Sequence, residues 1–109
     1  VFHALGTTRS SPGGLDHYVE CLPIAHLTDP GRECLLALSL GGRPLTDQHG
    51  APLRLVSPYD MGYKGTKFIG RIEFTEHEQA GWWTLANPVY PIDAPVPEDR
   101  FRKKPGIKG

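Results

Sequence analysis

Short apolar runs alternate with stretches rich in Gly, Pro, Ser and Thr along this chain. Residues 1–5 are predicted to be the end of a strand, and residues 18–22 a short extended segment. Between them, residues 6–14 form a loop with no packing pattern. Residues 23–27 are predicted to make one helical turn that ends before the next proline.

The middle of the chain predicts strands joined by tight turns. Residues 32–40 are apolar enough for a buried strand, and the Gly41-Gly42 pair after them is typical of a tight hairpin. Residues 54–57 and 66–75 are predicted as two further strands. Alternation along the second of these predicts an apolar face made of Phe68, Gly70, Ile72 and Phe74. Beyond Thr75 the pattern ends, and a proline-rich tail is predicted to be extended or irregular.

Composition narrows the function classes. A chain of 109 residues is sufficient for one globular domain, and its 12 basic and 12 acidic residues leave no net charge to attract nucleic acid. No apolar run approaches the ~20 residues of a membrane span, and no signal-peptide pattern is present. These features leave the compartment open. Because the chain opens at Val1 inside a predicted strand, we expect it to be a piece of a longer polypeptide.

The cysteines and histidines do not predict a zinc site. Cys21 and Cys34 lie in apolar contexts, where a buried small side chain is the ordinary role, and neither has a second thiol at ligand spacing. The five histidines do not pair with each other or with a cysteine at the spacing of zinc ligands. Trp82 and Trp83 are predicted as core or interface aromatics.

The segment 49–67, HGAPLRLVSPYDMGYKGTK, carries the clearest chemistry. A strand bounded by prolines holds Arg54, which can donate two parallel hydrogen bonds to an anion. The following loop contains glycines whose backbone N–H groups can turn toward an anion and lysines that add charge, namely Gly62, Gly65, Lys64 and Lys67. This pattern predicts a site for a phosphate-bearing ligand, with solvated side chains on a hairpin as the alternative.

A family resemblance supports the ligand site. HGAPLRLVSP, followed by GTK and FIGRIEF, resembles the molybdopterin-binding segment of the sulfite oxidase family. Tyr18 ahead of CLPI, and LLALSLGGRPLTDQHG, are similar to upstream motifs of that family in the same order. The resemblance covers residues 2–74. It implies an α+β fold dominated by strands in a mixed sheet, with residues 1–109 as the C-terminal part of a molybdopterin-binding domain and residues 75–109 as an irregular tail.

The resemblance also implies roles for individual residues. Arg54 and Lys67 would hold the phosphate of the molybdopterin cofactor, Gly65 and Thr66 would offer backbone N–H groups, and His49 would contact the pterin. In the complete domain, molybdenum performs oxygen-atom transfer, and electrons pass to or from a partner redox protein.

Tyr18 stands where sulfite-oxidising members place an active-site tyrosine, so the resemblance implies a catalytic role for its hydroxyl. The molybdenum of the family is bound by a cysteine thiolate in an earlier segment, and neither Cys21 nor Cys34 matches that context. We therefore expect no metal ligand in this chain.

Three interpretations remain open from the sequence. The chain is the cofactor-binding part of an oxidoreductase whose N-terminal half supplies the thiolate, a catalytically inactive relative with a ligand-binding or interaction role, or an unrelated small β domain. Under the first, the apolar 35–38 segment and the tryptophan pair are predicted to be covered by the N-terminal half or by self-association.

Overall fold

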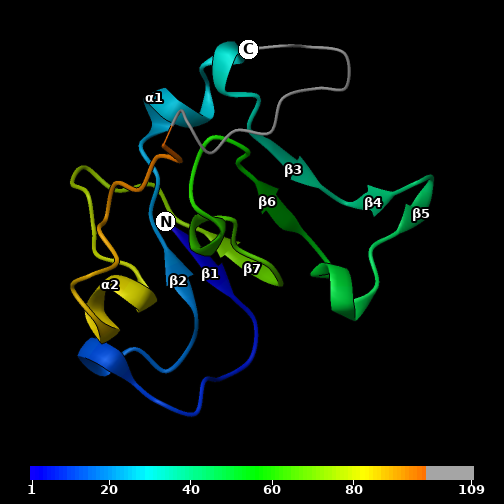
Figure 1. Ribbon diagram of the computed structural model, residues 1–109. Coiled ribbons are helices and arrows are strands. Elements are labelled where there is room, and N and C mark those ends of the chain that lie inside the picture. The colour runs from blue at the N-terminus through cyan, green and yellow to red at the C-terminus, as the bar shows by residue number, and fades with distance from the viewer. Residues whose placement is uncertain (98–109) are drawn as a thin grey trace.

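A three-stranded antiparallel sheet lies at the centre of the computed structural model, which describes residues 1–97 (Figure 1). Its order is β2-β1-β7, formed by Val19–Glu20, Phe2–Ala4 and Ile69–Ile72. Phe2 of the middle strand lies opposite both Glu20 and Ile72. The strands predicted at residues 1–5, 18–22 and 66–75 are thus confirmed, although each is shorter than its predicted span.

Two smaller antiparallel sheets stand beside the central one, to the right in Figure 1. Strand β3 (Leu35–Ala37) pairs with β6 (Arg54–Val56), and β4 (Ser39–Leu40) pairs with β5 (Arg43–Pro44). The predicted hairpin at Gly41-Gly42 is confirmed. Both glycines have positive φ angles, 60° and 78°, which a two-residue hairpin turn of this hand requires.

Helical segments are short. The α-helices are α1 (Ile24–Leu27), where one turn was predicted, and α2 (Trp82–Ala86). Four single 3₁₀ turns connect the strands: η1 (Pro12–Gly14), η2 (Pro30–Arg32), η3 (Asp47–His49) and η4 (Gly62–Lys64). None of the helices within residues 1–97 is long and apolar enough to cross a membrane.

The core joins the central sheet to β6. Phe2, Leu22, Leu55 and Ile69 form one buried cluster, and Val1, Val19 and Cys21 form a second one. The prediction of a buried Cys21 is confirmed. Because β6 contributes Leu55 to the same cluster as β1 and β7, the strand that carries Arg54 is fixed against the central sheet.

The α+β class is confirmed, but the expected single mixed sheet is wrong. The strand pairs within residues 1–97 are all antiparallel and belong to three separate sheets. The reason is strand length. Each strand spans only two to four residues, so each offers few backbone groups for pairing and every ladder is short.

One burial prediction is also wrong. The 32–40 run is exposed, since Leu35, Leu36, Leu38 and Leu40 expose 47–68% of their surface. The apolar face of the 66–75 strand, for which no burial was predicted, is exposed as well, with Phe74 at 80%, whereas Ile69 of the opposite face enters the core. In both cases the sheet has a second face that no other element within residues 1–97 covers, so apolar composition alone did not decide burial.

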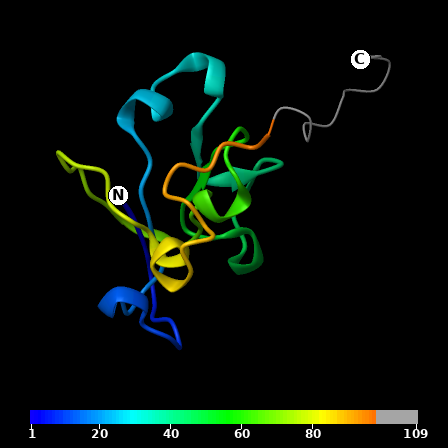
Figure 2. The same ribbon diagram turned by 60° about the vertical axis from the view of Figure 1, so that its left-hand side comes forward.

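The tail expected to be irregular contains helix α2, which lies beside η1 (Figure 2). Leu85 of α2 packs over Gly13, where a Cβ atom would approach Leu85 Cδ1 to 2.9 Å. This contact explains the helix, because a five-residue helix depends on tertiary packing. Pro105 lies outside the described residues.

Candidate functional site

A cavity of about 480 Å³ opens between the loop after β1 and the η4 turn. This volume falls within the ~300–1,000 Å³ usual for small-molecule sites. Its lining combines small, aromatic and cationic residues: Ala4, Leu5, Thr7, Thr8, Tyr18, Gly62, Gly65, Lys67, Phe68 and Trp83. Three of the six predicted site residues, Tyr18, Gly65 and Lys67, therefore lie around one cavity, although Tyr18 is far from the other two in sequence.

Tyr18 immediately precedes β2, and its hydroxyl donates a hydrogen bond to the carbonyl of Tyr63 in η4. Burial raises the pKa of Tyr18 well above its usual range, and the nearby Glu20 carboxylate raises it further. The phenol therefore stays protonated at neutral pH, and its proton is directed to the η4 backbone.

Replacing Tyr18 with Phe is expected to lower the free energy of unfolding by about 0.5–1.5 kcal/mol, because the Tyr63 carbonyl loses its donor. Urea denaturation measures the change. Tyr90→Phe is the control, since that phenol is exposed to 36% and we expect a change within about 0.5 kcal/mol. Equal stability of Tyr18→Phe and the unmodified protein would show that the Tyr18 hydroxyl does not hold η4.

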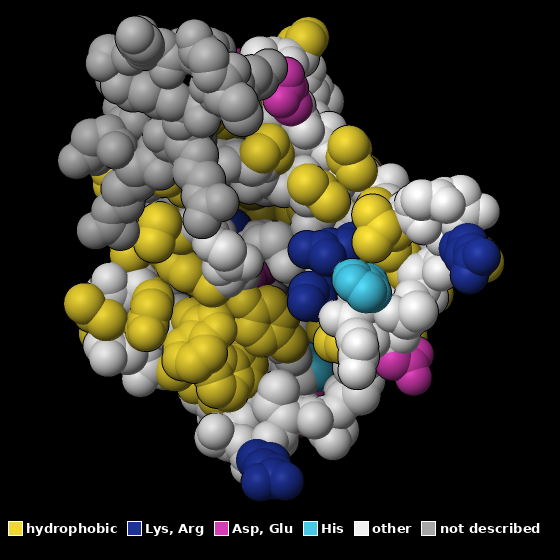
Figure 3. Space-filling view, turned by 45° about the vertical axis from the view of Figure 1, so that its right-hand side comes forward, with side chains coloured by type: hydrophobic (Ala, Val, Ile, Leu, Met, Phe, Trp, Pro, Cys, Tyr) yellow, Lys and Arg dark blue, Asp and Glu magenta, His cyan; other side chains and the backbone are white. Residues whose placement is uncertain are grey.

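Two other predicted residues, His49 and Arg54, lie near Lys67 at the end of η3. Arg54 Nη1 donates to the carbonyl of His49 at 3.4 Å, and Lys67 Nζ donates to the carbonyl of Gln48 at 3.5 Å. Both contacts are at the long limit for a hydrogen bond, so neither cation has a strong partner there. In Figure 3, Lys and Arg side chains gather beside a histidine at the edge of a hollow.

Arg54 also has an unsatisfied donor. Its Nε is buried and has no hydrogen-bond partner within residues 1–97. A buried guanidinium nitrogen left in this state costs free energy, and an anion that accepts from Nε and a terminal nitrogen together would recover it. The arrangement therefore suits a two-oxygen acceptor such as a phosphate.

Gly50 determines where Lys67 lies. A Cβ atom at Gly50 would approach Cβ and Cγ of Lys67 to 2.8 Å, and Gly50 adopts a φ of 96°, which L-residues with side chains rarely adopt. Both facts require glycine here. The stem of Lys67 therefore runs against the η3 backbone, and the same residue lines the 480 Å³ cavity. Lys67 links the cation group to the cavity.

Gly65 and Thr66 already use their backbone N–H groups. The Gly65 N–H donates to the carbonyl of Gly62 at 3.1 Å, and the Thr66 N–H donates to that of Lys64 at 3.1 Å. A ligand would have to replace these bonds to use the predicted donors. The side chain of Thr66 offers another donor, since its Oγ1 is buried with no protein partner.

The assignment of Lys64 to the anion-binding loop is wrong. Its side chain is 2% exposed, and Nζ donates to Glu20 Oε2 at 2.9 Å and to the carbonyl of Cys21 at 2.7 Å. Burial raises the pKa of the Glu20 carboxyl even though Lys64 opposes the shift. The ammonium group points into the protein because this carboxylate, buried on β2, needs a counter-charge.

Neither cysteine lines the cavity. Cys21 is buried in the core, and Cys34 Sγ lies 3.4 Å from Ser57 Oγ on the β3–β6 side. Within residues 1–97, no three His, Cys, Asp or Glu side chains are grouped so that they can hold a metal ion.

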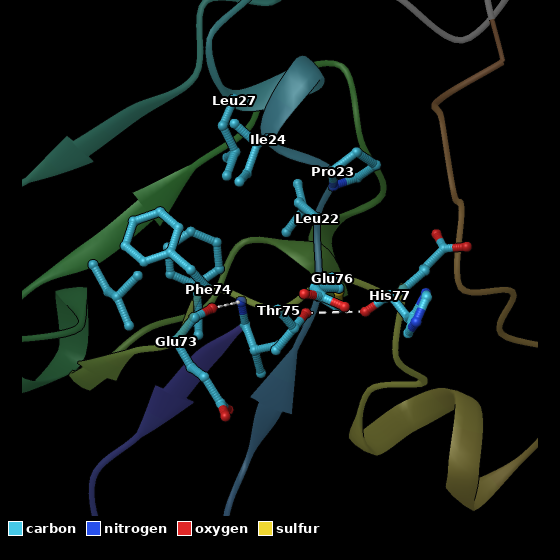
Figure 4. Close-up of a pocket in the computed structure, with 14 residues that line it drawn as sticks. Leu22, Pro23, Ile24, Leu27, Glu73, Phe74, Thr75, Glu76 and His77 are labelled. Atoms are coloured by element: carbon cyan, nitrogen blue, oxygen red, sulfur yellow. Dashed lines mark hydrogen bonds between the residues drawn. The ribbon is translucent and has the colours of Figure 1, made fainter.

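A second, smaller cavity of about 240 Å³ lies at the opposite end of β1, beside Val1 and Phe2 (Figure 4). Leu22, Ile24 and Leu27 line one wall, and the 73–78 segment, which includes Phe74 and His77, lines the other. None of the predicted site residues lies there.

Sequence reasoning missed three parts of the site. Glu20 is buried beneath it, the Tyr63 carbonyl accepts from Tyr18, and Trp83 closes one wall of the cavity. Gly50 was also missed as a spacer, although its position directly after His49 was a usable signal. The other three depend on contacts between distant segments and left no local pattern.

Comparison with known proteins adds two findings. A family model described as "Oxidoreductase molybdopterin binding domain" matches residues 1–83. A protein-methionine-sulfoxide reductase catalytic subunit MsrP from Gluconobacter oxydans (strain 621H) is 41% identical over 83 residues, which are 76% of this chain and 26% of that relative. The chain thus spans about a quarter of the length of the relative it matches. No solved structure matches.

Proposed function

The chain belongs to the family of oxidoreductase molybdopterin-binding domains, of the sulfite oxidase type, and on this premise we propose that it holds the molybdopterin cofactor between the cation group at η3 and the 480 Å³ cavity. The observation that carries the proposal is the buried Arg54 Nε without a partner, next to Lys67. We propose further that residues 1–109 are part of a sulfite-oxidase-like fold.

The residues present fit a phosphate-bearing cofactor. Arg54 has an unsatisfied buried donor, and Lys67 has only a long contact to the Gln48 carbonyl. Gly50 leaves room for the stem of Lys67. Two cations whose partners within residues 1–97 are weak, one of which lines the cavity, match an anionic group attached to a larger ring system.

Each side chain then has a distinct task. Arg54 would bind two phosphate oxygens and Lys67 would add a point charge. His49 would contact the pterin edge through Nε2, because its Nδ1 is within 2.7 Å of Thr46 Oγ1. Gly65 would form part of the wall under the ring, and the buried Thr66, which does not itself line the cavity, would offer Oγ1 as the free donor.

Tyr18 would face the reacting end of the cofactor. It shares the cavity with Lys67, so a ligand held by the lysine extends toward the phenol. The cofactor itself supplies oxygen-atom transfer at molybdenum in the whole enzyme. The chain supplies position and electrostatics, with Tyr18 as a protonated, fixed phenol.

The substrate and the partners of the whole protein follow from the relatives. We propose a methionine sulfoxide in a protein as the substrate class, since the relative is named as a protein-methionine-sulfoxide reductase catalytic subunit. An electron-transfer protein would supply the electrons. A segment outside this chain would supply the thiolate ligand, because neither cysteine lines the cavity.

The proposal is tested on the protein that contains this chain, purified from its own host. Pterin content, measured as fluorescence of the oxidised pterin, is expected to fall in Lys67→Met by about tenfold, an effect of ~1.4 kcal/mol that suits a partly solvated charge contact. Arg43→Met, which removes an exposed cation of the β4–β5 hairpin, is expected to leave the content unchanged. Equal pterin content in all three proteins would contradict the role of Lys67, and absence of pterin from the unmodified protein would favour a non-catalytic relative.

A further inference from the structure

Four titratable side chains form a continuous line on the face of the central sheet away from the site described above. Asp16 Oδ1 lies 2.7 Å from His17 Nδ1, His17 Nε2 lies 2.8 Å from His3 Nδ1, and His3 Nε2 lies 2.8 Å from Glu73 Oε1. The two imidazole rings are 5.1 Å apart between centroids. His3 is largely buried, with 14% of its side chain exposed.

The two outer contacts fix one proton on each ring. Hydrogen bonding to His17 lowers the pKa of the Asp16 carboxyl, and hydrogen bonding to His3 and Arg71 lowers that of Glu73, so both are carboxylates at neutral pH. A carboxylate only accepts, and therefore His17 Nδ1 and His3 Nε2 must each donate.

The inner contact then requires a third proton. With one proton on each outer nitrogen, two neutral rings would bring two lone pairs face to face at 2.8 Å, which is repulsive. One additional proton between His17 Nε2 and His3 Nδ1 converts this contact into an N–H···N hydrogen bond. The two rings together then carry a single positive charge.

We propose that His3 and His17 form a proton-binding site that holds one shared proton between two carboxylates. The charges balance: Asp16 and Glu73 contribute two negative charges, and the histidine pair and Arg71 contribute two positive ones. Arg71 Nη2 donates to Glu73 Oε1 at 3.2 Å. It also lies 3.3 Å from His3 Nε2, because both nitrogens donate to the same carboxylate oxygen. The backbone nitrogen of Val1 donates to the backbone carbonyl of Glu73 at 2.6 Å.

The site suits a proton better than a metal ion. Two Zn–N bonds of about 2.0–2.1 Å at a tetrahedral angle place their nitrogens about 3.3 Å apart, wider than the 2.8 Å observed here. No three ligand side chains converge on one point in the part of the chain that the structure describes.

The shared proton is coupled to the loop that lines the larger cavity. His17 directly precedes Tyr18, and the Thr8 N–H donates to the Asp16 carbonyl at 2.9 Å. Thr8 in turn accepts a hydrogen bond from Trp82 Nε1 at 3.2 Å. When the shared proton leaves, repulsion between the two lone pairs pushes His17 from His3, and the 6–17 loop loses an anchor. The loop is thereby anchored most firmly while the shared proton is bound and less firmly once the proton has left.

The proposal is tested by nitrogen-15 NMR of the whole chain without added cofactor, so its outcome is independent of cofactor binding. At acidic pH we expect a scalar coupling across the hydrogen bond between His17 Nε2 and His3 Nδ1. As the pH rises, both rings should change in one shared step, with loss of that coupling and faster hydrogen exchange of the Thr8 amide.

Two variants separate this site from a merely structural contact. His3→Gln is expected to abolish the coupling and to remove the pH-linked change in Thr8 exchange, after correction for the intrinsic exchange rate. His77→Gln, at an exposed histidine of the 73–78 segment, should leave both unchanged. Two rings that titrate in separate steps without a coupling, or a Thr8 response that persists in His3→Gln, would overturn the proposal.

Discussion

Replacing Lys64 with Met is expected to lower the free energy of unfolding by about 3–5 kcal/mol, which is the usual cost of breaking a buried ion pair from one side. Glu20 is fully buried, and Lys64 is its charged partner at 2.9 Å. Without the ammonium group, the carboxylate must stay charged in the interior or take up a proton. Urea denaturation at neutral pH measures the loss.

The pH dependence of this loss has a defined sign. Burial raises the pKa of the Glu20 carboxyl above its ordinary value of 4.5, and removal of Lys64 raises it further. A folded protein that binds the extra proton gains stability as the pH falls toward 4.5. The penalty of Lys64→Met is therefore largest at neutral pH and decreases on acidification.

A double variant distinguishes the ion pair from simple packing. Glu20→Leu combined with Lys64→Met replaces both charges with apolar groups of similar size, and we expect it to recover most of the lost stability. Arg43→Met, on the exposed hairpin, should stay within about 0.5 kcal/mol of the unmodified protein. A double variant as unstable as Lys64→Met alone would show that the charge of Glu20 is not the source of the penalty.

Replacing Arg54 with Ala is expected to weaken cofactor retention by about 2–5 kcal/mol, because a desolvated phosphate would lose a two-pronged donor. Arg54 is placed for this task by β6, and its buried Nε has no protein partner. The measurement is pterin content after dialysis at increasing dilution. The loss of cofactor retention in Arg54→Ala should exceed that in Lys67→Met, because the charge of Lys67 is the more solvated of the two.

Arg54→Lys provides the matched comparison. It keeps the positive charge but removes the planar fork and the Nε donor, so we expect retention between that of Ala and Arg. Circular dichroism establishes whether each variant is folded. Unchanged pterin content in a folded Arg54→Ala protein would remove Arg54 from the phosphate site.

Local signals in the sequence were sufficient for the hairpin and for the placement of the strands. Gly41-Gly42 specifies a turn with positive φ through its own backbone freedom, and Pro52 and Pro58 bound the strand that carries Arg54. The family was also evident from ordered motifs between residues 2 and 74, and the matching family model extends this range to residues 1–83. These features depend on residues that are neighbours in the sequence, so the sequence pattern alone predicts them.

Only the tertiary structure decided which charged groups are available. Lys64 and Lys67 look alike in sequence, yet Lys64 pairs with a carboxylate 44 positions away while Lys67 lines a cavity. His3 and Glu73, 70 positions apart, meet only because β1 pairs with β7. The apolar faces of residues 35–40 and 68–74 likewise became exposed or buried according to what covers them. Which distant segments touch each other depends on how the sheets pack, and no local sequence pattern specifies which residues will meet.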